Sequence, residues 1–189
     1  MRRPRRMLEQ EIKLAYPDLE AARLAVTTAG GRLETSLRLL DDRLFDTADL
    51  TLRKAGCALR LRRDDTRTFL TFKGRVQPGR VKTREEHETS AGSADVLQTI
   101  LHSLGYQQVF RAQKMREEYA LAGAHIAIDH TPMGTFVEIE GVPDTIASAT
   151  DALGRTKSDY ILDSYPSLFR QWCDARGLPP QDMLLDARV

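Results

Sequence analysis

The chain has 189 residues, 41% of them apolar and 29% charged, a balance typical of a globular domain large enough to bury a core. Its 28 Lys and Arg residues nearly equal its 27 Asp and Glu residues, so the net charge of +1 gives no support for a nucleic-acid or membrane-surface partner. The two cysteines, Cys57 and Cys173, are far apart in sequence, which excludes a disulfide framework or a zinc-binding spacing and favours a cytoplasmic location.

The chain begins with the basic sequence MRRPRRML, which no apolar stretch follows, so it does not resemble a secretory signal. No apolar run is long enough to cross a bilayer, and we expect no membrane partner. We expect a flexible basic arm at 1–6, a single domain over 7–176 and a C-terminal tail over 177–189. The paired arginines of the arm leave open the possibility of an acidic partner.

The first half of the chain predicts four strands and one helix. In the first strand, over 7–14, charged residues occupy alternate positions, a spacing that places them on one face of a strand. Residues 18–31 have apolar residues at helical spacing and end in Gly-Gly, as an amphipathic helix does. We expect the other strands at 36–47, 58–63 and 68–73, the last two joined as a hairpin.

The second half predicts four more strands and further helices. The alternating sequence of 81–89 predicts a strand, and Ser93 is a suitable N-cap for a helix over 93–105. Short turns then link three strands into an antiparallel meander, at 114–121, 125–130 and 135–140. Residues 144–176 are expected to be helical in pieces. Eight strands with separate helices indicate the α+β class.

One face of the predicted strands carries almost only charged residues. Its acids are Glu9, Glu11, Glu86, Glu88, Asp129, Glu138 and Glu140. Its bases are Lys13, Arg60, Arg62, Lys73, Arg84, Lys114 and Arg116. A half-buried sheet with a solvated face explains any single strand. The recurrence over six strands favours a closed barrel whose charged faces line a lumen and whose apolar faces pack against outer helices.

A lumen rich in carboxylates requires compensating charge. Two like charges about 5 Å apart repel by roughly 3 kcal/mol at an effective dielectric constant near 20. Divalent cations such as Mg²⁺ or Mn²⁺ bind carboxylate oxygens and often share them with substrate phosphates. The arginines and lysines in turn match the oxygens of phosphate groups. Carboxylates, metal and a basic cage together indicate phosphoryl-transfer chemistry.

At this point the sequence resembles a known family. EQEIK at 9–13 is similar to the ExExK signature of the CYTH-domain proteins, the triphosphate tunnel metalloenzymes, and the resemblance continues in order over residues 7 to 170. The later motifs are LFDTADLTLRKAGCALRLRR, LTFKG, KTREEHE, KMREEY, IDHTPMGTFVEIE and TKSDY. The resemblance implies an eight-stranded antiparallel barrel that forms a tunnel, with helices outside, and Mg²⁺ or Mn²⁺ as cofactor.

The resemblance also implies roles for individual residues. Glu9, Glu11, Glu138 and Glu140 match the ligands of a first metal, and Asp129 and Glu88 are candidates for a second. The triphosphate cage would be formed by Lys13, Arg60, Arg62, Lys73, Arg84, Lys114 and Arg116, with Lys157 closing one end. Two positions depart from the family pattern: Leu44 replaces a tyrosine, and Asp159 is inserted in the late motif.

Three functions follow as hypotheses. The first is a metal-dependent hydrolase of inorganic triphosphate, thiamine triphosphate or a nucleoside triphosphate. The second is a class IV adenylyl cyclase, which would form cyclic AMP and pyrophosphate from ATP. The third is a barrel that binds polyphosphate without catalysis. Interleaved acids argue against a nucleic-acid partner, because grooves that follow a phosphate backbone are dominated by bases. A homodimer is left open.

Two further glutamates lie next to the cage residues. Glu118 shares the face of Arg116 and could enter the lumen. Glu117 falls on the apolar side of the same strand, where we expect it to be solvated.

Overall fold

The computed structural model describes residues 7–65, 67–179 and 181–185; the predicted arm at 1–6 lies outside the described residues. The strands are β1 (Met7–Tyr16), β2 (Arg32–Thr47), β3 (Ala58–Asp64), β4 (Arg67–Lys73), β5 (Lys82–Ala91), β6 (Tyr106–Leu121), β7 (Ala124–Thr131) and β8 (Gly134–Glu140). The helices are α1 (Leu19–Thr28), α2 (Thr51–Lys54), α3 (Ala94–Ser103), α4 (Pro143–Ala152) and α5 (Tyr165–Asp174), with a 3₁₀ turn, η1 (Lys157–Asp159).

Within the described residues, eight strands form one closed antiparallel barrel in the order β1-β5-β4-β3-β2-β6-β7-β8. β1 closes it, because the first half of β1 pairs with β5 and the second half with β8. This register places Glu9 opposite Arg84 and Lys13 opposite Glu138, so acids and bases alternate across strands. The predicted α+β class and eight-stranded barrel are confirmed.

Two helices begin at the residues that the sequence indicated. The side chain of Asp18 accepts a hydrogen bond from the Ala21 N–H at 2.8 Å, and that of Ser93 accepts one from the Val96 N–H at 3.3 Å. Such caps satisfy N–H groups that have no partner within the helix. Gly105 follows α3 with a φ of +87°, a conformation that glycine adopts without strain.

Two strands are longer than predicted. β2 and β6 each contain 16 residues, whereas the sequence indicated only 36–47 and 114–121. The additional residues lack a clear apolar alternation. They are extended because β2 and β6 pair with each other along almost their whole length, through several register shifts. Tertiary pairing therefore overrides a weak local pattern.

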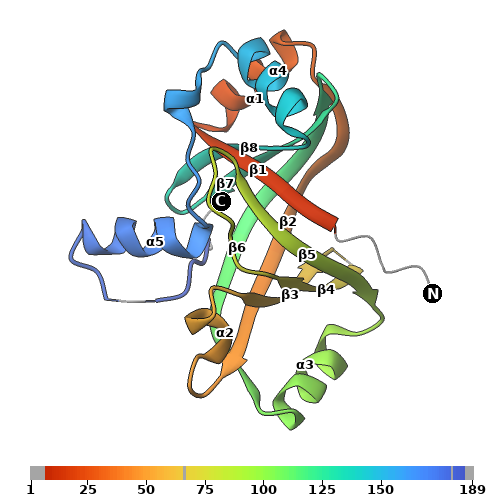
Figure 1. Cartoon of the computed structure of the whole chain (residues 1–189), viewed down its shortest axis with the longest axis vertical. Coiled ribbons are helices and arrows are strands. Elements are labelled where there is room, and N and C mark those ends of the chain that lie inside the picture. Colours follow the sequence, from red (N-terminus) through yellow and green to blue (C-terminus); the bar gives the residue numbers. More distant parts are fainter. Residues whose placement is uncertain (1–6, 66, 180, 186–189) are drawn as a thin grey trace.

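The hydrophobic core lies outside the barrel, between its apolar outer faces and the helices. Ile12, Leu14, Ile126, Ile128, Val137 and Ile139 pack against Ala22, Val26, Ile146 and Ala149 of α1 and α4. A second cluster joins Phe45 and Leu61 to Leu101 of α3. Figure 1 shows α1 and α4 together at one end of the molecule and α3 at the other. The predicted outward orientation of the apolar faces is thus correct.

A third cluster fixes the C-terminal region. Phe169 and Cys173 of α5 pack with Met183, which is 1% exposed. The Gln113 N–H of β6 donates to the Met183 carbonyl at 2.7 Å, and the Met183 N–H donates to the Arg111 carbonyl at 2.9 Å. Part of the segment that the sequence assigned to a tail is therefore packed on the barrel.

No helix in the described ranges is long and apolar enough to cross a membrane.

Candidate active site

The barrel contains a cavity of about 700 Å³ whose wall is rich in charge. The predicted site residues that line it are Glu9, Glu11, Lys13, Arg60, Arg62, Lys73, Arg84, Glu88, Lys114, Arg116, Glu138 and Glu140. Two predicted site residues are not part of its lining. Asp129 is fully buried, and Lys157 is exposed in η1. The alternating charges of separate strands thus face one shared space.

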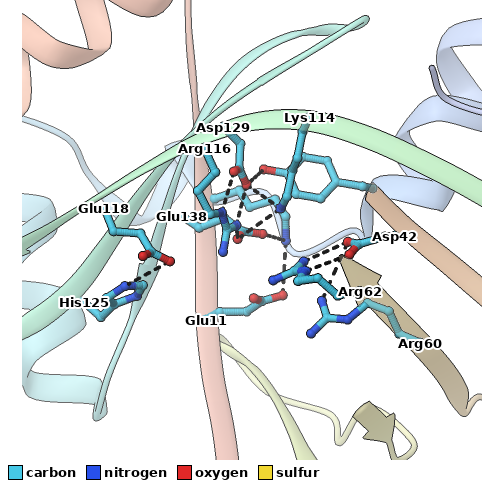
Figure 2. Close-up of polar contacts among 12 residues, drawn as sticks. Glu11, Asp42, Arg60, Arg62, Lys114, Arg116, Glu118, His125, Asp129 and Glu138 are labelled. Carbon is cyan, nitrogen blue, oxygen red and sulfur yellow. Dashed lines mark hydrogen bonds and ion pairs between the residues drawn. The ribbon is translucent and has the colours of Figure 1, made fainter. Parts of the chain in front are cut away.

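Glu11 and Glu138 lie at the centre of the ionic network, with Lys13 between them. Lys13 Nζ lies 3.1 Å from Glu11 Oε1 and 3.2 Å from Glu138 Oε1. Arg116 also contacts Glu138, and Figure 2 shows both side chains pointing into the same space as Glu11. Burial and the Glu138 charge oppose ionisation of Glu11, but Lys13 and Lys82 hold its pKa below the usual value. Burial likewise opposes ionisation of Glu138, but Lys114, Lys13 and Arg116 hold its pKa well below the usual value, so both carboxylates are charged.

A second group of contacts surrounds Glu9. Lys73 Nζ donates to Glu9 Oε1 at 2.8 Å, and Arg84 Nε donates to Glu9 Oε2 at 2.7 Å. Burial alone would raise the pKa of Glu9, but Lys73, together with Arg84, holds it well below the usual value. Lys73 also contacts Glu86, whose pKa is raised by burial and by its interaction with Glu9.

β2 and β3 supply a third group. Arg62 donates from Nε and Nη2 to both carboxylate oxygens of Asp42, at 2.7 and 2.8 Å (Figure 2). Arg60 Nη2 donates to Glu88 Oε2 at 3.3 Å and to the Thr71 hydroxyl at 3.2 Å. The buried Arg60 Nε has no hydrogen-bond partner among the described residues.

Asp129 holds two cage residues in place. Its Oδ2 accepts hydrogen bonds from Lys114 Nζ and from the Tyr165 hydroxyl, both at 2.7 Å, and its Oδ1 accepts one from Arg116 Nε at 2.6 Å. Both oxygens are thus occupied within the protein. Coordination of a second metal by Asp129 would require some of these hydrogen bonds to be replaced, and this role stays a prediction.

Lys114 is a buried cage residue whose pKa is lowered. Burial and the neighbouring Arg116 lower the pKa of Lys114 to about 8, although Asp129 and Glu138 favour its charged form. Its Nζ also lies 4.5 Å from the centre of the Tyr165 ring, a cation–π geometry. The first residue of α5 therefore contacts both Lys114 and its carboxylate partner.

Four glutamates of β1 and β8 influence one another. Burial and repulsion from Glu9, Glu11 and Glu138 raise the pKa of Glu140 to about 7. More than a third of Glu140 is exposed, and solvent screens the repulsion from the other glutamates. A titration should therefore find a pKa no higher than about 7. The mutual repulsion indicates that these carboxylates converge.

The donor set fits a hard divalent cation, because Mg²⁺ and Mn²⁺ prefer carboxylate oxygens. In the described part of the chain, no three His, Cys, Asp or Glu side chains are arranged to hold a metal ion. The reason is that Glu9, Glu11 and Glu138 each turn toward a lysine or arginine. The metal-ligand set stays a prediction.

Among the cavity-lining residues that the sequence analysis did not assign are Lys82, Asp42 and Tyr165, which contact the ionic network. Lys82 lies two residues before Arg84 on β5 and therefore on the same face, so its position in the lumen could have been predicted from the sequence. Asp42 lies on a lumen face between Leu40 and Leu44, so the charge alternation is not visible there. Tyr165 begins a helix, where strand alternation gives no signal.

The two adjoining glutamates of β6 differ. Glu118 lines the cavity, as expected, and accepts a hydrogen bond from Arg38 at 2.9 Å. The expected solvation of Glu117 is wrong, because Glu117 is only 3% exposed. Arg23 of α1 covers it and donates to both of its oxygens, at 2.9 and 3.1 Å from Nε.

The fold and the site define a closed barrel protein with a charged internal cavity. Residues 7–158 match the family model of the CYTH domain, and the chain belongs to this family. A protein of Methanocaldococcus jannaschii, whose name proposes an adenylate cyclase, is 30% identical over 173 residues, which cover 86% of this chain and 98% of that protein.

Solved structures share the same barrel. A Vibrio parahaemolyticus protein described as a proposed adenylate cyclase matches with a TM-score of 0.75 at 19% identity, over 87% of this chain and 98% of that one. A Hippeastrum protein matches with a TM-score of 0.67 at 18% identity, over 96% of this chain and 98% of that one. It is described as a proposed adenylyl cyclase with a dominant triphosphatase activity. At these identities the likeness shows a common fold.

Proposed function

We propose that this protein is a metal-dependent hydrolase that cleaves a triphosphate compound inside the barrel, with Mg²⁺ or Mn²⁺ as cofactor. The observation that carries the proposal is a wall of cations that surrounds one continuous cavity. These are Lys13, Arg60, Arg62, Lys73, Lys82, Arg84, Lys114 and Arg116. Guanidinium and ammonium groups match phosphate oxygens, and a linear triphosphate carries several of them.

The unpaired donor of Arg60 supports an anionic ligand. A buried N–H without a partner costs free energy, typically about 1–3 kcal/mol. Arg60 Nε is closed to solvent, so a shift of the side chain on binding would be needed for it to donate to a phosphate oxygen and remove this cost. The binding of the anion would thus complete the hydrogen bonding of the wall.

The lysines and arginines of the cage would bind, orient and stabilise the reacting phosphates. Negative charge shifts toward the leaving and equatorial oxygens during phosphoryl transfer, and fixed cations stabilise it. Asp42 and Asp129 hold Arg62, Lys114 and Arg116 in position, so these donors need little rearrangement. The enclosing barrel limits access of bulk water.

The glutamates of β1 and β8 would hold the cofactor. Glu9, Glu11, Glu138 and Glu140 supply the oxygens, and their charges are otherwise balanced in part by the cage. A bound Mg²⁺ or Mn²⁺ neutralises phosphate charge and lowers the pKa of a water molecule. We assign no side chain as general base.

The alternative is an adenylyl cyclase, which the name of the 30% identical M. jannaschii protein favours. The same cations would stabilise a pyrophosphate leaving group, and the nucleophile would be the ribose 3′ hydroxyl. The description of the Hippeastrum protein, a proposed cyclase whose dominant activity is triphosphatase, indicates that such a name does not exclude hydrolysis. We therefore place hydrolysis first.

Product analysis separates the candidates. Purified protein is incubated with Mg²⁺ or Mn²⁺ and with inorganic triphosphate, thiamine triphosphate or ATP, and the products are separated by chromatography. We expect inorganic phosphate as the main product. Cyclic AMP and pyrophosphate from ATP would support the cyclase instead. Tight binding without turnover of any compound would leave only the polyphosphate-binding barrel.

A further inference from the structure

The chain between η1 and α5 runs along an edge of β1 that β5 leaves open. β5 pairs with β1 only as far as Glu11. Two residues further along β1, the Lys13 N–H donates to the Ile161 carbonyl at 3.0 Å, and the Ile161 N–H donates to the Lys13 carbonyl at 2.9 Å. The residues that follow, 162–167, line the cavity. A segment beyond the family match at 7–158 therefore forms part of the cavity wall.

Tyr165, in this segment, contacts two lysines of the cage with its ring. The ring centre lies 4.5 Å from Lys114 Nζ and 5.1 Å from Lys13 Nζ. Both distances are within the range of a cation–π contact. The two lysines belong to β6 and β1, so one ring restrains ammonium groups that two separate strands supply.

The hydroxyl of Tyr165 contacts the cage at a different group. It donates to Asp129 Oδ2, the same oxygen that accepts a hydrogen bond from Lys114 Nζ. Burial, together with the charges of Asp129 and Glu138, raises the pKa of Tyr165 well above its usual value, so the hydroxyl keeps its proton and can donate. Tyr165 therefore restrains Lys114 both by its ring and, through the shared oxygen, by its hydroxyl.

The start of α5 holds the Tyr165 ring in this place. Ser164 caps the helix and Pro166 lies in its first turn, where a missing N–H leaves no hydrogen bond unmade. The ring also meets Phe136 of β8 edge to face, with ring centres 5.7 Å apart. One turn later Phe169 is buried in the third apolar cluster. The orientation of Tyr165 is thus fixed before any ligand arrives.

Attachment of α5 to the barrel does not account for these contacts. Phe169 and Cys173, both almost fully buried, already attach the helix through apolar packing. A residue that served only as an anchor would need apolar neighbours, whereas Tyr165 turns its face toward two cations and its hydroxyl toward a carboxylate.

We propose that Tyr165 is a positioning residue of the triphosphate site, which holds the ammonium groups of Lys13 and Lys114 where they meet phosphate oxygens. The inference rests on the proposed triphosphate chemistry and adds a residue that acts through the two lysines. A free lysine side chain samples many rotamers. A restrained one stabilises the charge that develops during phosphoryl transfer without first having to reorganise.

Two substitutions separate the ring of Tyr165 from its hydroxyl. Steady-state kinetics are measured with Mg²⁺ and with inorganic triphosphate or ATP, whichever wild type cleaves faster. Tyr165→Leu should lower kcat by about thirtyfold and change KM by less than about threefold, because unrestrained lysines still reach the phosphates but no longer stay aligned as charge develops. Tyr165→Phe keeps the ring and should restore kcat to within about threefold of wild type.

The nearby Tyr160 provides the matched control. It packs against the core outside the barrel, and its hydroxyl lies 3.1 Å from the Thr150 hydroxyl oxygen. Tyr160→Leu should lower the melting temperature, as Tyr165→Leu does, but leave kcat within about twofold of wild type. An equal loss of kcat in the two leucine variants would show that Tyr165 acts only on the fold and would overturn the inference. Wild-type kcat in Tyr165→Leu would overturn it as well.

NMR signals of the lysines test their positions without turnover. In protein with ¹³C-labelled lysine, the ring current of Tyr165 should shift the ε-methylene signals of Lys13 and Lys114, while the exposed Lys54 serves as the internal reference. Tyr165→Leu should abolish both shifts and Tyr165→Phe should keep them. Shifts that persist in Tyr165→Leu would overturn the inference. A wild-type protein that cleaves no triphosphate compound would overturn the proposed function instead, and the lysine signals would still show whether Tyr165 fixes the two side chains.

Discussion

Glu138 is the residue at which the carboxylates and the cationic cage meet. It contacts Arg116, lies 3.2 Å from Lys13 Nζ and lies 3.9 Å from Lys114 Nζ. Three buried cations therefore share this carboxylate in addition to their contacts with Asp129 or Glu11, and Glu138 is also a predicted metal ligand. A change at this residue should affect folding and turnover by separate routes.

Glu138→Gln is expected to lower kcat by at least about 10²-fold, the usual loss when a preorganised charge of an active site is removed. It should also lower the melting temperature of the ligand-free protein, because removing one partner of a buried ion pair costs roughly 3–5 kcal/mol. Steady-state kinetics and thermal melting measure the two effects. Glu34→Gln, at an exposed pair with Arg32, is the control. Wild-type turnover in Glu138→Gln would refute the assignment of Glu138 to the metal site.

Glu140 should make the stability of the metal-free protein depend on pH. Its pKa is raised from 4.5 to about 7, so between these values the unfolded chain releases a proton that the folded protein retains. The free energy of unfolding should therefore fall as the pH rises through this window. Melting curves of wild type and Glu140→Gln in EDTA, between pH 4.5 and 7.5, measure this contribution. Parallel curves for the two proteins would show that Glu140 titrates normally.

At the scale of the elements, α1 is fixed to β6 by a polar contact within an apolar interface. Arg23 of α1 covers the buried Glu117, whose Oε1 also accepts a hydrogen bond from the Tyr119 hydroxyl at 2.9 Å. Arg23 is only one-third exposed, so its loss would leave a carboxylate without its charged partner under the helix.

Arg23→Ala should therefore destabilise the protein by roughly 2–3 kcal/mol, somewhat less than for a fully buried pair. Replacement of both residues, as Arg23→Met with Glu117→Leu, should recover most of this loss because no buried charge remains. Denaturant unfolding measures all three proteins. Glu20→Ala, which removes only the exposed partner of Arg23, should have almost no effect. A double variant no more stable than Arg23→Ala would contradict this account.

The elements also show what the sequence could predict. On β1, β3, β5 and β8 the alternation of charged and apolar residues predicted which side chains face the lumen. It could do so because each side chain on these strands faces either the lumen or the apolar outer side. On β2 the rule fails, since Leu40 and Leu44 share the lumen side with Asp42. Burial of Glu117 could not be predicted either, because its partner Arg23 belongs to a separate helix. Tyr165 and Met183 reach the cavity through tertiary packing of the C-terminal region.

At the scale of the whole molecule, a ligand that neutralises the tunnel should stabilise it. A ligand at about 100 times its dissociation constant adds about 2.7 kcal/mol, which corresponds to roughly 5–10 °C in the melting temperature of a protein of this size. We expect this shift with Mg²⁺ and ATP together, measured by calorimetry under conditions that limit turnover. An unchanged melting temperature at saturating ligand would contradict binding in the tunnel.

The position of β1 in the barrel has a consequence for biosynthesis. The first strand must pair with the last, so Lys13 meets Glu138 only after nearly three-quarters of the chain has left the ribosome. Until then the ionic faces of the early strands remain hydrated, and closure removes water from all of them in one late step. Such distant pairing favours slow folding. A nascent chain that stalls before β8 would present an open, charged sheet to the chaperones it encounters.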